Sequence, residues 1–205
     1  MENIKKNVIF LDIDGVLNTW HTLRELLLYE NEKYYNEVQN EKLKILSEIC
    51  HRYDCKVVMS STHKDIMDEK TLEIQKDGEE WFKELLEAFK IYDIELIGRT
   101  PTVTRKDTET DKSFVWKEDE IRLYLFRHPE VDHYVILDDD DLEDKHKKSD
   151  LDKVKAHLVK TDNHLENHSE KEGLLERHID EVGEVLKKEN EIKKFALKRQ
   201  EKRTM

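Results

Sequence analysis

Five short runs of apolar, mostly β-branched residues recur along the chain, separated by stretches with helical periodicity. The runs are residues 7–11, 56–59, 94–97, 133–137 and 156–159. Nearly every position of the first run is apolar, as expected of a strand that is buried on both faces. Strands that alternate with helices predict an α/β fold, in which a doubly wound parallel sheet of five strands has helices on both faces. Ligands of such sheets bind beyond the carboxyl ends of the strands.

Amphipathic stripes predict the intervening helices, because their apolar residues recur on one helical face. The third stripe ends at His128-Pro129, where the proline disfavours further helix. The stripes consist of Leu43, Leu46, Cys50 and Tyr53; Trp81, Leu85 and Phe89; and Ile121, Tyr124 and Leu125.

The sequence changes character near residue 186. A helical stripe ending at Leu186 can dock on the sheet, whereas residues 187–205 carry eight Lys/Arg and three Glu, a local charge of +5. We therefore expect one domain over residues 1–186 and a basic helical tail over 187–205. Inside the domain, residues 18–40 have room only for a small flap, and the polar loop 102–112 is short as well. The sequence thus predicts a minimal cap and an open site.

The charge balance limits the classes of partner. The chain has 36 Lys and Arg against 48 Asp and Glu, which gives a net charge of −12. A body this acidic repels nucleic-acid backbones unless a local patch or a metal ion reverses the field. No apolar run approaches the roughly 20 residues that span a bilayer, and no signal-peptide core begins the chain. We therefore expect a cytoplasmic protein without a membrane partner.

Cysteines and histidines have structural as well as metal-binding interpretations. Reduced thiols are favoured for Cys50 and Cys55 over a bridge or a metal pair, since two cysteines make no disulfide framework. His164 and His168 have the i, i+4 spacing of a zinc pair. No cysteine or carboxylate stands at a matching spacing, so solvated histidines are favoured there, as for His157 and His178.

Carboxylates follow two of the predicted strands. The first strand leads into Asp12-Ile13-Asp14-Gly15, and residues 134–137 lead into the four acids Asp138–Asp141. Taken singly, the first pair could cap the next element, and the second run could be a solvated charge cluster. Two buried strands that end in acids predict converging carboxylates, which a hard cation such as Mg²⁺ would compensate. Which acids of the second run would bind the metal stays open.

Two further segments supply groups for phosphate. Ser60-Ser61-Thr62 follows the strand 56–59, and these hydroxyls can donate hydrogen bonds to phosphate oxygens or cap the next helix. Lys117 opens the helix before the acidic strand, where its ammonium would offset the charge of carboxylates and phosphate.

The ordered set formed by Asp12-Ile13-Asp14-Gly15, Ser60, Lys117 and Asp138-Asp139 resembles the haloacid dehalogenase-like phosphohydrolase superfamily. It spans residues 7–141 in matching strand context, order and spacing. The segments 96–101 and 157–162 resemble a narrower branch of small phage and bacterial members, related to phosphatase domains of nucleic-acid repair proteins. One departure is His63-Lys64, where members of that branch carry Trp-Arg.

The resemblance implies a role for each matching residue. Asp12 would be the nucleophile that forms an aspartyl-phosphate, and Asp14 the general acid and base. Mg²⁺ would be held by the Asp12 carboxylate, the Asp14 backbone carbonyl and Asp138, with Asp139 as a second contact. Ser60, Ser61 and Lys117 would bind the phosphoryl oxygens.

An acid at the position of Asp14 favours phosphomonoester chemistry within the superfamily. The predicted function is therefore a Mg²⁺-dependent phosphatase acting on nucleotides or on phosphorylated nucleic-acid ends, a substrate class that an open site admits. Two alternatives remain: the same chemistry on a protein or sugar phosphate, and a non-catalytic binding module that uses the basic tail.

Overall fold

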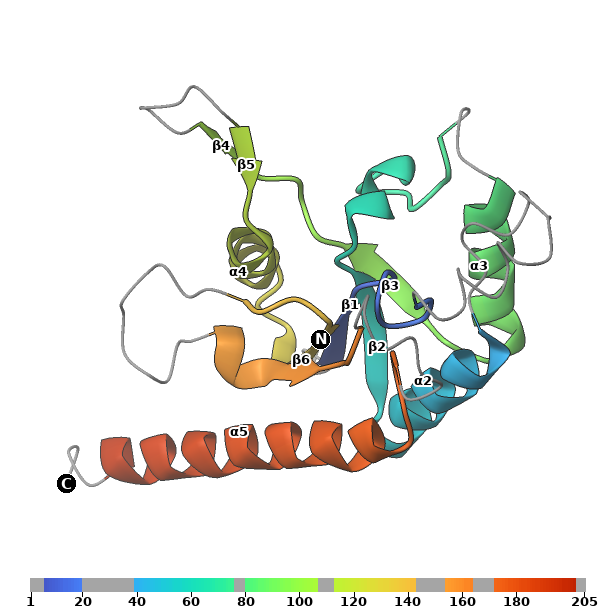
Figure 1. The fold of residues 1–205 in the computed structure, drawn as a ribbon. Helices are drawn as coiled ribbons and strands as arrows, with labels where there is room; N and C mark the ends of the chain where they lie inside the picture. The colour runs from blue at the N-terminus through green and yellow to red at the C-terminus, as the bar shows by residue number, and fades with distance from the viewer. Residues whose placement is uncertain are drawn as a thin grey trace.

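The computed structural model describes residues 6–19, 39–75, 80–106, 113–142, 154–163 and 172–201. Its centre is a five-stranded parallel sheet in the order β3-β2-β1-β6-β7 (Figure 1). The predicted α/β sheet is confirmed. Because the strand order reverses at β1, the carboxyl end of β1 is where a ligand is expected. The strands are β1 (Lys6–Leu11), β2 (Cys55–Met59), β3 (Leu96–Arg99), β6 (Val131–Asp138) and β7 (Leu158–Lys160).

Alternate side chains of β1 enter two cores on opposite faces of the sheet, as the two-residue period of a strand requires. Ile9 and Leu11 pack in the core that α2, α3 and α5 cover. Val8 and Phe10 pack in a second core against α4 and η4. The helices are α2 (Asn40–Tyr53), α3 (Glu80–Ile91), α4 (Lys117–Arg127) and α5 (Arg177–Glu201), with 3₁₀ turns η2 (Thr62–Ile66) and η4 (Val154–His157).

Two strands begin later than their apolar runs predict. The backbone N–H of Ile94 donates to the carbonyl of Phe89 at 2.8 Å, and Asp93 has a φ of 54°. These residues therefore close the C-terminal turn of α3, and β3 starts at Leu96. Similarly, η4 takes up residues 154–157 before β7. An apolar run indicates burial, but it does not distinguish a buried turn from a buried strand.

The prediction of a polar loop over residues 102–112 was wrong in part. β4 (Thr104–Lys106) pairs antiparallel with β5 (Ser113–Val115), and Thr104 lies opposite Val115. The pairing satisfies backbone groups that a loop would leave to solvent. Residues 107–112 lie outside the described residues, as do 20–38 of the predicted flap.

The C-terminal helix α5 docks on the sheet by its first half. Ile179, Val182 and Leu186 are buried in the core beside α2, as their spacing predicts, while Lys187 and Lys188 are exposed. The helix continues without interruption to Glu201, and its end extends beyond the sheet (Figure 1). The division at residue 186 therefore falls inside a helix and stays a prediction.

Both cysteines and two of the histidines, His157 and His178, make contacts typical of residues that stabilise a fold. Cys50 and Cys55 are free and buried, and burial raises the pKa of each thiol to about 12. That both thiols are reduced stays a prediction. His157 stacks on Tyr134, and Nδ1 of His178 accepts a hydrogen bond from the backbone N–H of Leu175 at 2.8 Å. His164 and His168 lie outside the described residues.

Burial of His178 predicts a loss of stability in mild acid. Desolvation, followed by the nearby Arg177 charge, lowers the pKa of His178 from 6.5 to about 4. Between these values the unfolded chain binds a proton that the folded protein excludes. The stability that the protein gains from keeping His178 neutral is therefore fully present above pH 6.5. It is lost as the pH falls from there through about 4.

Urea denaturation across this pH window measures the effect. The variant His178→Asn keeps an acceptor for the Leu175 N–H but has no imidazole to protonate, so its stability should change less with pH. The same pH slope in both proteins would show that another group governs the acid sensitivity.

Candidate active site at the carboxyl edge of the sheet

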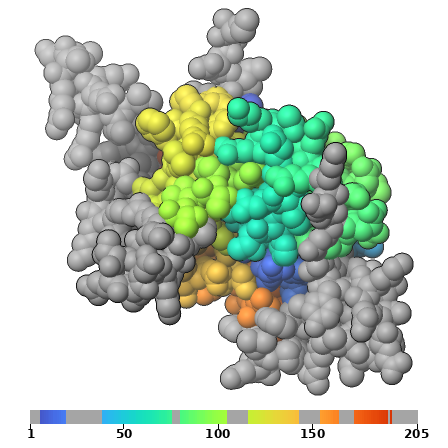
Figure 2. All heavy atoms as spheres, turned by 90° about the horizontal axis from the view of Figure 1, so that it is seen from above, coloured from blue at the N-terminus to red at the C-terminus, as the bar shows by residue number. Residues whose placement is uncertain are grey.

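Three adjacent strands bring the predicted site residues to one edge of the sheet. β1 ends at Leu11 and is followed by Asp12, β6 ends at Asp138, and β2 is followed by Ser60. The register holds these ends level, because Leu11 lies opposite Met59 on one side and Leu137 on the other. In a space-filling view, the η2 region (teal) and the residues from β3 to α4 (green to yellow) lie side by side on one face (Figure 2).

Lys117, the first residue of α4, lies between two of the carboxylates. Its Nζ donates to Oδ2 of Asp12 at 2.8 Å and to Oδ2 of Asp138 at 2.5 Å. Burial opposes the charge on the ammonium, but the two carboxylates outweigh burial, so the pKa of Lys117 is raised. Burial and then the Asp12 charge raise the pKa of Asp138, and Lys117 acts against both. The lysine thus balances negative charge that would otherwise be costly to bury.

A third carboxylate completes a possible metal site. Asp12, Asp138 and Asp139 each offer an oxygen, and these three oxygens lie within 4.8 Å of one another. Asn163 donates to Oδ2 of Asp139 at 2.8 Å, which orients the side chain. Carboxylate oxygens at the end of a rigid sheet fit the preference of Mg²⁺ for hard ligands. The other two acids of the run lie outside this group: Asp140 is exposed, and Asp141 pairs with Lys160.

Gly15 makes the close approach of Asp139 possible. Its φ is +73°, and a Cβ built there would lie 2.2 Å from the Asp139 carboxyl group. Only glycine both adopts this positive φ readily and leaves room for the Asp139 carboxyl group, which explains the glycine after the acidic pair.

The serines after β2 have different surroundings. The Ser60 side chain is 1% exposed, and its Oγ has no hydrogen-bond partner among the described residues. A buried hydroxyl without a partner is costly, so a ligand oxygen is the expected acceptor. Ser61 instead caps η2, since its side chain accepts from the backbone N–H of His63 at 3.4 Å.

Asp14 is not a member of the three-carboxylate group and makes contacts of its own. Asn18 donates to its Oδ1 at 2.9 Å, and Nε2 of His63 lies 3.0 Å from its Oδ2. The hydrogen bond from His63, which burial opposes and Asn18 supports, lowers the pKa of Asp14. Sequence reasoning gave His63 and Asn18 no role; Asn18 is close in the chain to Asp14, but nothing local signals His63.

A second contact that the sequence did not predict joins η2 to α4. Lys64 and Glu120 are buried and form an ion pair with Nζ and Oε2 2.9 Å apart. Lys64 belongs to η2 and Glu120 to the first turn of α4, so the pair joins the segment after Ser60 to the helix that begins with Lys117.

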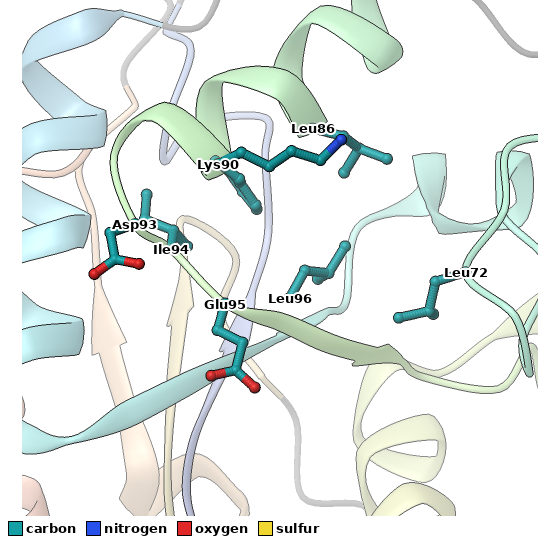
Figure 3. A pocket seen from close by; sticks show the side chains of 8 residues that line it. Leu72, Leu86, Lys90, Asp93, Ile94, Glu95 and Leu96 are labelled. Carbon is teal, nitrogen blue, oxygen red and sulfur yellow. The ribbon is translucent and has the colours of Figure 1, made fainter.

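One cavity among the described residues lies away from this site. It has a volume of about 500 Å³ and opens between the C-terminal end of α3 and β3, where Phe89, Ile94 and Leu96 line it (Figure 3). None of the site carboxylates lines it, and it lies where β3 begins rather than where the strands end. The cavity therefore does not belong to the candidate active site.

Comparisons with known proteins bear on this site. Residues 8–179 match the model of a family described as HAD domain in Swiss Army Knife RNA repair proteins, where HAD denotes haloacid dehalogenase-like. No curated protein and no solved structure gives a significant match. Within the described residues, no helix has the length and apolarity needed to cross a membrane. HAD domains are in general phosphatases, and the match includes every candidate residue of the site. The chain therefore belongs to the family of HAD domains found in Swiss Army Knife RNA repair proteins.

Proposed function

We propose that this protein hydrolyses phosphomonoesters with Mg²⁺, through an aspartyl-phosphate on Asp12, and that its substrates are nucleotides or phosphorylated nucleic-acid ends. The observation that carries the proposal is the meeting of Asp12, Asp138 and Asp139, of which Lys117 bridges the first two. The Ser60 hydroxyl follows the neighbouring strand and has no hydrogen-bond partner among the described residues.

In the first half of the reaction, an oxygen of the Asp12 carboxylate attacks phosphorus, and the bond from phosphorus to the leaving oxygen breaks. Asp14 gives its proton to that oxygen, so the product leaves as an alcohol. The Ser60 hydroxyl and the Lys117 ammonium hold phosphoryl oxygens as negative charge shifts among them.

In the second half, Asp14 takes a proton from water, whose oxygen attacks phosphorus and breaks the bond to Asp12. Inorganic phosphate leaves, and the Asp12 carboxylate is regenerated. The lowered pKa of Asp14 favours the ionised form that accepts this proton, and accepting it produces the acid form that the first half of the next turnover needs. When bound by Asp12, Asp138, Asp139 and the Asp14 backbone carbonyl, Mg²⁺ supplies positive charge that shields the nucleophile from its anionic substrate.

Two features support a nucleic-acid substrate. The family is named for RNA repair proteins. The charge that would repel a polyanion is partly balanced at the site, because Lys117 contacts both Asp12 and Asp138. The net charge of −12 therefore does not exclude a phosphorylated end from this edge of the sheet.

Phosphate release from a substrate panel tests the proposal. The panel holds p-nitrophenyl phosphate, 5′- and 3′-phosphorylated RNA oligonucleotides, nucleoside monophosphates, a sugar phosphate and a phosphopeptide. We expect release that EDTA abolishes and Mg²⁺ restores, with the highest kcat/KM on a nucleotide or an oligonucleotide end. Metal-independent release would contradict the chemistry, and a preference for the sugar phosphate or the peptide would contradict the substrate class.

A further inference from the structure

Asp14 is a half-exposed acid whose two oxygens are both held. Its side chain is 54% exposed, which would ordinarily leave a carboxylate on a loop free to rotate. Asn18 holds Oδ1 from four residues further along the same loop. Nε2 of His63 lies 3.0 Å from Oδ2 and comes from a segment 49 residues away. Two hydrogen bonds from different segments leave the carboxylate one orientation.

His63 is itself held in place from two sides. Its backbone N–H donates to the side chain of Ser61, so its main chain is tied to the loop that carries Ser60. Its ring meets Trp81 edge to face, with 4.9 Å between ring centroids and 83° between the planes. Trp81 stands in the first turn of α3 and packs in the same way on the buried Phe82. The imidazole therefore rests on the hydrophobic core.

We propose that His63 is a positioning residue, which holds the Asp14 carboxylate where it can pass a proton to the leaving oxygen. The inference rests on the proposed phosphatase activity, in which Asp14 is the acid and base. Proton transfer requires hydrogen-bond reach between Asp14 and the leaving oxygen. Without His63, the carboxylate keeps, among its contacts with the described residues, the bond to Asn18, and it samples orientations that miss that oxygen. A small misplacement of a reacting group costs up to about 100-fold in rate.

The leaving group separates this role from others. p-Nitrophenolate departs as a stable anion and hardly needs a proton, whereas a nucleoside or alkyl oxygen needs one. For His63→Ala we expect kcat/KM on a nucleoside monophosphate or alkyl phosphate to fall on the order of 10- to 100-fold. On p-nitrophenyl phosphate, kcat/KM should change by less than about threefold, because it reports only the steps up to loss of the leaving group. The later attack of water also uses Asp14, so kcat can fall on both substrates.

Two further variants complete the experiment. His63→Gln places an amide N–H near the position of Nε2 and should restore most of the lost rate. His51→Ala is the matched control, because His51 makes the same contact at 3.0 Å with Asp93, far from the site, and its loss should leave both rates unchanged. As a readout independent of turnover, Asp14→Asn should shift the ¹⁵N signal of His63 Nε2 and leave that of His51 unchanged.

The outcomes distinguish the inference from the proposed function. An equal fall of kcat/KM on both substrates, or no effect of His63→Ala, would overturn the positioning role and leave a hydrolytic wild type intact. Absence of Mg²⁺-dependent hydrolysis by the wild type would overturn both.

Discussion

Asp12→Asn is expected to lower the rate of phosphate release by on the order of 10⁴-fold, on p-nitrophenyl phosphate and on the preferred natural substrate alike. The amide that replaces the carboxylate has no negative oxygen to attack phosphorus, so no aspartyl-phosphate forms. The fold should survive, because Lys117 keeps its contact with Asp138 and one buried negative charge is removed. Initial rates with saturating Mg²⁺, together with a thermal melt of each protein, measure both expectations.

The matched control is Asp140→Asn. Asp140 stands in the same acidic run, is exposed and lies outside the three-carboxylate group, so the substitution removes the same charge without touching the site. We expect its rate to stay within about twofold of the wild type, as for other surface changes. Comparable rates for Asp12→Asn and Asp140→Asn would exclude Asp12 as the nucleophile.

Lys64→Ala is expected to cost about 3–5 kcal/mol of unfolding free energy, the largest stability loss that we foresee for one substitution. Lys64 is 3% exposed and Glu120 is 1% exposed, so removal of the lysine leaves a carboxylate buried without its counter-charge. Oε1 of Glu120 also accepts from the backbone N–H of Val103 at 3.1 Å, which hinders the carboxylate from turning toward solvent. Urea denaturation, read as the midpoint and slope of the transition, gives the free energy.

Two comparisons isolate the cause of this loss. Lys90→Ala breaks an exposed pair with Glu87 and should cost less than about 0.5 kcal/mol. The double variant Lys64→Met, Glu120→Gln removes both charges and keeps an acceptor for Val103, so it should recover most of the stability lost in Lys64→Ala. If Lys64→Ala and Lys90→Ala cost the same, the Lys64–Glu120 pair is not buried in solution.

Much of the fold was predictable because its signals are local. The apolar run at residues 7–11 can only be satisfied by burial on both faces, and the structure places its alternate residues in two cores. The start of β3 was not predictable, because the turn at Asp93 and Ile94 depends on the end of α3. The pairing of β4 with β5 was missed for a similar reason, since strands of three residues are too short to show a period.

The candidate site was likewise predictable only in part. Asp12 and Asp138 were predictable as neighbours, because both follow buried strands and parallel strands end at one edge. That Lys117 would offset charge near the acids was predictable, but its contacts with both Asp12 and Asp138 were not. Lys117 and Asp12 are 105 residues apart in the sequence, so only the fold brings them together. His63 and Lys64 stand next to each other, yet one contacts Asp14 and the other a buried glutamate of α4.

The sequence by itself determined the five strands of the central sheet to within a few residues, their order and the supply of carboxylates, because hydrophobic period and strand-end polarity act over a few residues. Only the tertiary structure decided which acids share the lysine, which lie outside the cluster and what holds Asp14. Those choices depend on desolvation and on distances between side chains from different elements, and both quantities exist only once the helices have packed on the sheet.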